Sequence, residues 1–167
     1  MKIVGIDPGY ERLGLAIIEH STKNHDELIY STCLTTPKTI SFPERLGLLA
    51  LKIEPLLAEH RPEILAIEEL FFSGNQKTAM KVSEVRGMII YLAIKAGMKI
   101  INLTPLQIKM STTGYGRASK SQVITMIKKF IRVPKGSRHD DEYDAIAIAL
   151  TGAANSRQPF IHTLAKL

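Results

Sequence analysis

The sequence contains a single cysteine, Cys33, and it lacks any long apolar run. A lone cysteine cannot form an internal disulfide bond, so nothing indicates an oxidising compartment, and we expect Cys33 to be a small core residue. The longest apolar run, residues 88–94, is far shorter than the roughly 20 residues that cross a bilayer. No signal peptide pattern precedes the first apolar run, and we therefore expect a cytoplasmic protein.

Acidic residues are absent from residues 85–139, although the whole chain contains 16 Asp and Glu. The same stretch is rich in Lys and Arg, so it cannot neutralise its own charge, and the chain carries a formal net charge of +6. Such a stretch is typical of a surface that contacts a phosphate backbone. A basic surface that is merely solvated is the alternative.

Internal repeats and low-complexity tracts are also missing, and 167 residues suffice for one good core. We therefore expect a single domain over residues 1–167. Its ordered core is predicted to span about residues 1–155, with a loosely attached tail over about residues 156–167.

Short apolar runs and helix-capping signals predict a mixed α/β fold. The apolar runs predict strands at residues 3–6, 15–18, 27–35, 64–67 and 99–103. Capping and period-3.6 signals predict helices at residues 41–60, 75–96, 104–114, 119–131 and 140–154. Pro55 is expected to kink or interrupt the last turns of the first helix. The first helix is a crossover that makes the fourth strand a parallel partner, which predicts a five-stranded mixed sheet with helices on both faces.

The first strand ends on Asp7, which the turn pair Pro8-Gly9 follows. The next apolar run begins only a few residues later, so the two runs predict an antiparallel hairpin with Asp7 at its mouth. The fourth strand ends on Glu68, and if it pairs with the first strand, Asp7 and Glu68 become neighbours at one edge. Because Asp before Pro-Gly is also a common turn former, this stretch alone assigns no function.

The last predicted helix begins with a group of acids. Asp141 and Asp144 are three residues apart and share a helix face that continues through the apolar Ile148, so both are predicted to point toward the sheet. Acids in a first turn also interact favourably with the helix dipole. That alternative accounts for Asp140 and Glu142, but not for acids on the packing side.

Convergence of Asp7, Glu68, Asp141 and Asp144 would bring like charges together. Each close pair costs on the order of 1 kcal/mol in water and ~4 kcal/mol in a partly buried site, so cations must balance them. Oxygen ligands without Cys or a His cluster favour Mg²⁺ or Mn²⁺. Two such ions about 4 Å apart would contact the attacking and leaving oxygens of a phosphodiester. With the basic stretch, this arrangement predicts a nuclease.

Several short segments resemble, in the same order, those of the bacterial RuvC-type Holliday junction resolvases. They are residues 5–9 (Gly-Ile-Asp-Pro-Gly), 66–71 (Ala-Ile-Glu-Glu-Leu-Phe), 86–87 (Arg-Gly), 119–123 (Ser-Lys-Ser-Gln-Val) and 141–149. The resemblance implies a ribonuclease H-like fold, a homodimer, and paired metal-dependent nicks placed symmetrically across a four-way DNA junction. It also implies an association with a branch-migration helicase.

The resemblance carries catalytic roles to four positions. It implies that the metal-binding acids are Asp7, Glu68, Asp141 and Asp144, with two Mg²⁺ ions, for which Mn²⁺ substitutes. The pair His139-Asp140 departs from the family pattern. This departure leaves Asp140 as an alternative to Asp141.

The resemblance and the basic stretch together indicate DNA-binding residues. Phe71 matches an aromatic that such enzymes wedge against a base, but the adjacent Phe72 leaves open which of the two stacks and which packs in the core. Lys109 and Lys120 match basic residues that hold DNA. The DNA-binding candidates are therefore Phe71, Phe72, Arg86, Lys109, Arg117 and Lys120.

The helix predicted at residues 75–96 is apolar all round between Met88 and Ile94, which fits either a central core helix or a two-fold interface. Two alternatives to a junction endonuclease stay open: a related nuclease that acts on RNA/DNA hybrids, and a DNA-binding module without catalysis. Actin-like ATPases also place an Asp-x-Gly turn after their first strand. That fold is normally duplicated, and this chain has no second copy.

Overall fold

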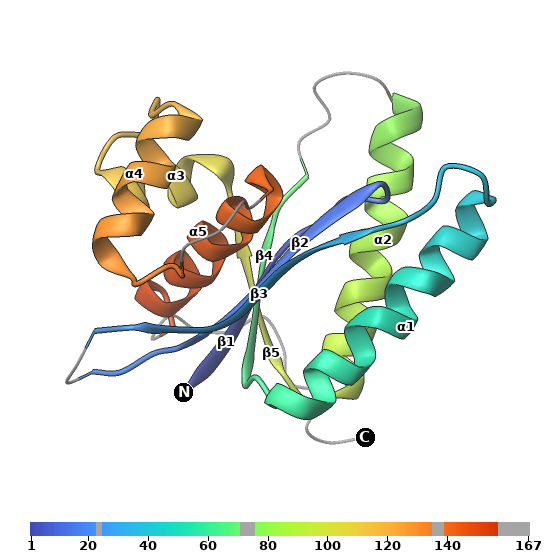
Figure 1. The fold of residues 1–167 in the computed structure, drawn as a ribbon, viewed down its shortest axis with the longest axis horizontal. Coiled ribbons are helices and arrows are strands. Elements are labelled where there is room, and N and C mark those ends of the chain that lie inside the picture. Colours follow the sequence, from blue (N-terminus) through green and yellow to red (C-terminus); the bar gives the residue numbers. More distant parts are fainter. Residues whose placement is uncertain (23–24, 71–75, 135–138, 157–167) are drawn as a thin grey trace.

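A five-stranded sheet with the strand order β3-β2-β1-β4-β5 separates two layers of helices in the computed structural model (Figure 1). The structure describes residues 1–22, 25–70, 76–134 and 139–156. The strands are β1 (Lys2–Asp7), β2 (Arg12–Glu19), β3 (Glu27–Thr35), β4 (Ile64–Glu68) and β5 (Lys99–Leu103). All five predicted strands are therefore confirmed.

Helices cover both faces of this sheet. α1 (Phe42–His60) and α2 (Gln76–Lys95) pack on one face, whereas α3 (Pro105–Thr113), α4 (Lys120–Phe130) and α5 (Asp140–Ala154) lie on the other (Figure 1). The predicted mixed sheet with helices on both faces is confirmed. In the part of the chain that the structure describes, no helix is both long and apolar enough to cross a membrane.

The central strand β1 joins the antiparallel and parallel halves of the sheet. It pairs antiparallel with β2, so that Asp7 lies opposite Gly14, and parallel with β4, so that Ile6 lies opposite Ile67. The predicted parallel placement of the fourth strand is thus confirmed, and its partner is β1, the case that the sequence left open. Because parallel strands end at the same edge of a sheet, Asp7 and Glu68 come together there.

Alternation of side chains decides which face each of these acids takes. Val4 and Ile6 belong to the apolar core beneath α1 and α2, whereas Ile3 and Ala66 belong to the core beneath α5. Residues two positions apart in a strand share a face, so Asp7 and Glu68 also lie on the α5 side of the sheet. Both carboxylates therefore face the helix that carries the remaining predicted acids.

Small residues let α5 lie directly on the sheet. A Cβ atom at Gly5 would overlap the carbonyl oxygen of Ala145, and one at Gly14 would overlap the carbonyl oxygen of Asp141. The two glycines thus set how close the start of α5 comes to β1 and β2. Any added methyl group would have to displace helix backbone.

Helix ends follow the predicted capping signals. Ser41, Thr104 and Ser119 are N-caps with complete capping boxes. Pro55 was predicted to kink or interrupt α1; the interruption is wrong, because α1 continues through Pro55 to His60, and the kink stays a prediction. Proline lacks the N–H group for one helical bond, but Leu57 remains buried beyond it and keeps the last turns on the core. The predicted cap Asn75 and the tail over residues 157–167 lie outside the described residues.

Candidate active site

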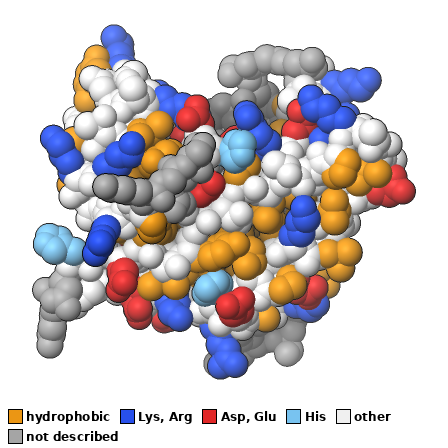
Figure 2. Space-filling view, in the orientation of Figure 1, with side chains coloured by type: hydrophobic (Ala, Val, Ile, Leu, Met, Phe, Trp, Pro, Cys, Tyr) orange, Lys and Arg blue, Asp and Glu red, His pale blue; other side chains and the backbone are white. Residues whose placement is uncertain are grey.

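Three acids from three different elements line one cavity of about 300 Å³. Asp7 comes from the end of β1, Glu68 from the end of β4, and Asp144 from the second turn of α5. Lys109 of α3 and Lys120 of α4 line the same cavity. Figure 2 shows acidic and basic side chains interspersed around the hollow at the top of the view. Residues that are far apart in the sequence therefore meet, as the strand-end argument predicts.

Lys120 is the cation closest to these acids among the described residues. Its Nζ donates a hydrogen bond to Oδ2 of Asp144 at 2.7 Å and lies 3.7 Å from Oδ2 of Asp140. Burial raises the pKa of Asp144, and the bond from Lys120 opposes that rise. Because Lys120 follows the N-cap Ser119, the capped start of α4 brings this positive charge to the cavity.

The carboxylates repel one another in a poorly solvated space. Burial, followed by the charges of Asp144 and Glu68, raises the pKa of Asp7 from 3.8 to about 7. Burial and the charge of Asp144 also raise the pKa of Glu68. Because both pKa values are raised, the fully ionised cluster is unfavourable unless further positive charge enters it.

This strain predicts that the metal-free protein loses stability as the pH rises. Between pH 4 and pH 7 the native Asp7 holds a proton that the unfolded chain has released, so the free energy of unfolding falls across this interval. At 1.36 kcal/mol per pKa unit, Asp7 accounts for a fall of at most about 4 kcal/mol. Urea unfolding at pH 4 and pH 8 in EDTA measures this fall, and Asp7→Asn should largely remove it. An equal fall in the variant would contradict the role of Asp7.

Asp141 does not line the cavity but lies beside it. Its Oδ2 forms an ion pair with Arg12 Nε at 3.2 Å and lies 3.9 Å from Sγ of Cys33. Its charge still raises the pKa of Asp7, as a smaller cause than burial, Asp144 and Glu68. The structure therefore gathers three of the four predicted acids around the cavity and turns the fourth toward β2 and β3. Asp140, the alternative to Asp141, pairs with Lys120 from an exposed position.

The helix-dipole interpretation of Glu142 is incomplete. Its side chain is buried against the sheet, and its Oε2 accepts a hydrogen bond from the Ser31 hydroxyl at 3.1 Å. Two acids at the start of α5, Asp141 and Glu142, thus contact β3. Sequence patterns miss these contacts because they depend on how α5 is rotated over the strands.

Arg86 has structural partners at the end of β4. Its Nε donates to the carbonyl oxygen of Glu68 at 3.1 Å, and its Nη2 donates to Oδ1 of Asn102 at 2.5 Å. These bonds tie α2 to the ends of β4 and β5 and hold the backbone that carries Glu68. A DNA contact by Arg86 stays a prediction. It would have to use the remaining hydrogen-bond donors of a half-buried guanidinium.

The other DNA-binding candidates are placed differently. Lys109 and Lys120 face the acids, and Arg117 is exposed between α3 and α4. Phe71 and Phe72 lie outside the described residues. The structure thus brings two of the predicted basic residues to the cavity and leaves the aromatic prediction as it stood.

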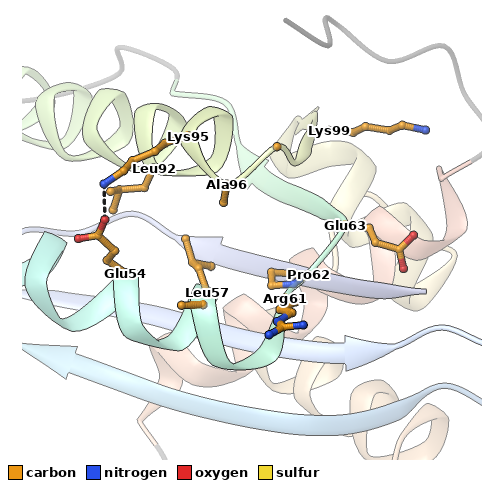
Figure 3. Close-up of a pocket in the computed structure, with 11 residues that line it drawn as sticks. Glu54, Leu57, Arg61, Pro62, Glu63, Leu92, Lys95, Ala96 and Lys99 are labelled. Atoms are coloured by element: carbon orange, nitrogen blue, oxygen red, sulfur yellow. Dashed lines mark hydrogen bonds and ion pairs between the residues drawn. The ribbon is translucent and has the colours of Figure 1, made fainter. Parts of the chain in front are cut away.

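A larger cavity of about 700 Å³ lies at the opposite end of the sheet (Figure 3). It is formed between the last turns of α1 and α2, over Leu57 and Leu92. Glu54 faces it but is paired with Lys95 at 2.5 Å. None of the predicted catalytic acids lines this cavity, so size alone does not identify the site.

The donor set of the smaller cavity fits a hard divalent cation. Its described lining offers carboxylate oxygens from Asp7, Glu68 and Asp144 and contains neither Cys nor His. Oxygen ligands of this kind suit Mg²⁺ or Mn²⁺, and the raised pKa values of the acids show that positive charge is needed. The three acids would hold such an ion.

Comparison with known proteins gives one consistent result. The family sequence model described as crossover junction endodeoxyribonuclease RuvC matches residues 3–152, a range that contains all four predicted acids. A protein of that name from Caldanaerobacter subterraneus subsp. tengcongensis is 39% identical over 150 residues, which cover 90% of each chain. Another from Alkaliphilus oremlandii is 40% identical over 153 residues, covering 92% of this chain and 93% of the relative.

Solved structures agree with this result. The Thermus thermophilus RuvC structure superimposes with a TM-score of 0.84 at 31% identity, covering 94% of this chain and 96% of that one. The structure of T. thermophilus RuvC in complex with a Holliday junction substrate has the same TM-score at 29% identity and the same coverage. The yeast mitochondrial Holliday junction resolvase, at 13% identity, has a TM-score of 0.67 over 90% of this chain and 77% of its own, and so shares the fold.

Proposed function

Because the chain belongs to the crossover junction endodeoxyribonuclease RuvC family, we propose that its carboxylate cavity cuts the strands of four-way DNA junctions. The protein is a Holliday junction resolvase with a ribonuclease H-like fold, and membership in this nuclease family implies dependence on divalent metal ions. The observation that carries the catalytic proposal is the meeting of Asp7, Glu68 and Asp144 beside two lysines. We propose one nuclease domain over residues 1–167, with its ordered core over about residues 1–155.

The acids hold the metal in this proposal. Asp7, Glu68 and Asp144 supply oxygen ligands from three elements, and Asp141 joins them when its exposed partner Arg12 releases it. These acids would hold two Mg²⁺ ions, or Mn²⁺ in their place, which when bound would supply a polarised water and positive charge for the departing oxygen. Arg86 fixes the backbone of Glu68 and so keeps one ligand in place.

The basic residues position the DNA. Lys109 and Lys120 face the acids, so a phosphate that enters the cavity would meet positive charge next to the metal ligands. We propose that Lys120 exchanges its bond to Asp144 for a phosphate contact when a DNA strand enters the cavity. Arg117 extends this surface, and either Phe71 or Phe72 stacks on a base near the crossover.

A cleavage experiment tests the function directly. The purified protein is incubated with a synthetic mobile four-way junction, with and without Mg²⁺, and in parallel with an RNA/DNA hybrid. Symmetrically paired nicks in the junction that require Mg²⁺ are expected. Cleavage of the hybrid alone would favour the RNA-directed alternative, and binding of the junction without any cut would favour a non-catalytic module.

Lys120→Ala is expected to weaken junction binding without Mg²⁺. It should also make the negative slope of log affinity against log salt shallower by about one. The reason is the loss of one counterion-releasing contact beside the cavity. Lys99→Ala is the matched control, since it removes one positive charge at the opposite end of β5. Fluorescence anisotropy over a salt series measures both slopes. An unchanged slope for Lys120→Ala would remove this residue from the DNA-binding surface.

We also propose a homodimer through the outer side of α2. The inner side of α2 buries Val85 and Ile89, whereas Met80, Tyr91 and Ile94 remain exposed at helical spacing. Apolar residues on both sides of one helix favour a second packing partner, and a two-fold dimer would match the approximate two-fold symmetry of a four-way junction. Sedimentation as a dimer supports this assembly, and a monomer at micromolar concentration contradicts it. A branch-migration helicase is a further proposed partner, on family resemblance alone.

A further inference from the structure

We propose that Cys33, His139 and Asp141 form a separate binding site for a borderline divalent cation such as Zn²⁺. The three side chains each offer one ligand atom, and these atoms all lie within 4.8 Å of one another. They come from β3, from the residue before α5 and from the first turn of α5. None of them lines the cavity that contains Asp7, Glu68 and Asp144.

The sheet register explains why this cluster forms. Asp7 lies opposite Gly14, and Gly14 lies opposite Cys33, so these residues form one row across β1, β2 and β3. Residues opposite one another share a face, so Cys33 points to the α5 side as Asp7 does. Since Gly14 has no side chain, the start of α5 lies directly over this row and places Asp141 beside Cys33.

The spacing of the donors suits a tetrahedral ion. Zn–S and Zn–N bonds of about 2.3 and 2.0 Å place neighbouring ligand atoms roughly 3 to 4 Å apart. Sγ of Cys33 is already 3.9 Å from Oδ2 of Asp141, and the imidazole of His139 lies within the 4.8 Å limit. Small side-chain rotations are enough to close the site. A water molecule would supply the fourth ligand.

The donor types separate this site from the carboxylate cavity. Thiolate and imidazole ligands favour Zn²⁺ and Co²⁺, whereas the all-oxygen set of Asp7, Glu68 and Asp144 favours Mg²⁺. Excess Mg²⁺ therefore competes poorly for the sulfur-containing site. Two neighbouring sites of different chemistry result, and Asp141 belongs to both.

Arg12 is the group that opposes metal binding here. Its Nε lies 3.2 Å from the Asp141 oxygen that faces Cys33, so a cation must displace it. The Arg12 side chain is 59% exposed and has room to turn into solvent. Because the Arg12 half of this ion pair is exposed, the pair contributes little to stability. Arg12 thus holds Asp141 in the metal-free protein and gives way to a cation that binds the cysteine and histidine as well.

A consequence for cleavage follows, and it rests on the proposed function. An ion bound by Cys33 and His139 holds Asp141 on the β3 side, away from Asp7 and Glu68. Zn²⁺ should therefore slow junction cleavage in the presence of Mg²⁺. The site would link nuclease activity to the availability of a thiol-binding metal.

Binding is tested with Co²⁺, because a thiolate bound to Co²⁺ produces a charge-transfer absorption in the near ultraviolet. The full-length protein in excess Mg²⁺ is expected to show this absorption, and Cys33→Ser should lose it. Asp7→Asn is the matched control and should keep it, since Asp7 belongs to the other site. His139→Asn should weaken Co²⁺ binding at least tenfold. Because His139 is exposed, this variant tests whether the metal site exists even if Cys33→Ser fails to fold. Absence of the absorption in the wild-type protein, or equal Co²⁺ affinity in wild type and His139→Asn, overturns the site.

Cleavage in Mg²⁺ with added Zn²⁺ tests the consequence separately. The wild-type nuclease should be inhibited at Zn²⁺ concentrations at least tenfold lower than those that inhibit Cys33→Ser. Equal inhibition of both proteins overturns the link to cleavage. If the wild-type protein cuts no junction in Mg²⁺ alone, before any Zn²⁺ is added, the proposed function is contradicted. The Co²⁺ measurement still decides whether the metal site exists.

Discussion

Asp7→Asn is expected to lower the rate of junction cleavage by about three orders of magnitude or more. Asp7 lies at the centre of the acid cluster, where both Glu68 and Asp144 influence its pKa, so its loss removes a ligand from the proposed metal site. Metal ions contribute several kcal/mol to such reactions, and each 1.36 kcal/mol is a factor of ten in rate. Single-turnover cleavage of a labelled four-way junction in Mg²⁺ measures this loss.

Junction binding by Asp7→Asn should remain largely intact. The neutral Asn resembles the protonated Asp7 of the metal-free protein in size and charge, and the lysines beside the cavity are unchanged. Glu19→Gln is a suitable control, because it removes one negative charge at the far end of β2. Cleavage by Asp7→Asn within tenfold of wild type would show that the reaction does not depend on this carboxylate.

Gly14→Ala should destabilise the protein by about 1 to 3 kcal/mol or more and should also impair cleavage. The added Cβ would overlap the carbonyl oxygen and carbon of Asp141, which are backbone atoms that cannot rotate away. Overpacking of this kind forces backbone shifts of the stated cost. The start of α5 would move off the sheet and carry Asp141 and Asp144 with it. Urea unfolding and the cleavage assay measure the two effects.

Gly47→Ala is the matched control for that change. Gly47 lies inside α1, and a Cβ there would meet no atom within 4 Å. Alanine in place of glycine in a helix interior stabilises by about 0.5 to 1 kcal/mol, so the same substitution should raise stability here. If Gly14→Ala were as stable as Gly47→Ala, the close approach of α5 to β2 would not be a constraint on the fold.

Local sequence signals predicted the elements well because their causes are local. Serine or threonine followed by Glu or Gln three residues later makes a capping box wherever it occurs, as at Ser41 and Ser119. A crossover helix between two apolar strands favours a parallel placement of the second strand, so the sequence predicted that Asp7 and Glu68 would meet if these two strands paired, and they do. The interruption predicted at Pro55 failed because burial of later residues outweighed the local penalty.

The sequence by itself determined the two strand ends that carry Asp7 and Glu68, the acids at the start of the last helix, and the acid-free basic stretch. These follow from periodicity, capping and composition, which act over a few residues. Only the tertiary structure decided that Asp144 faces the cavity while Asp141 turns toward Arg12 and Cys33. The physical reason is that the rotation of α5 over the sheet depends on backbone packing against Gly5 and Gly14, contacts that join opposite ends of the chain.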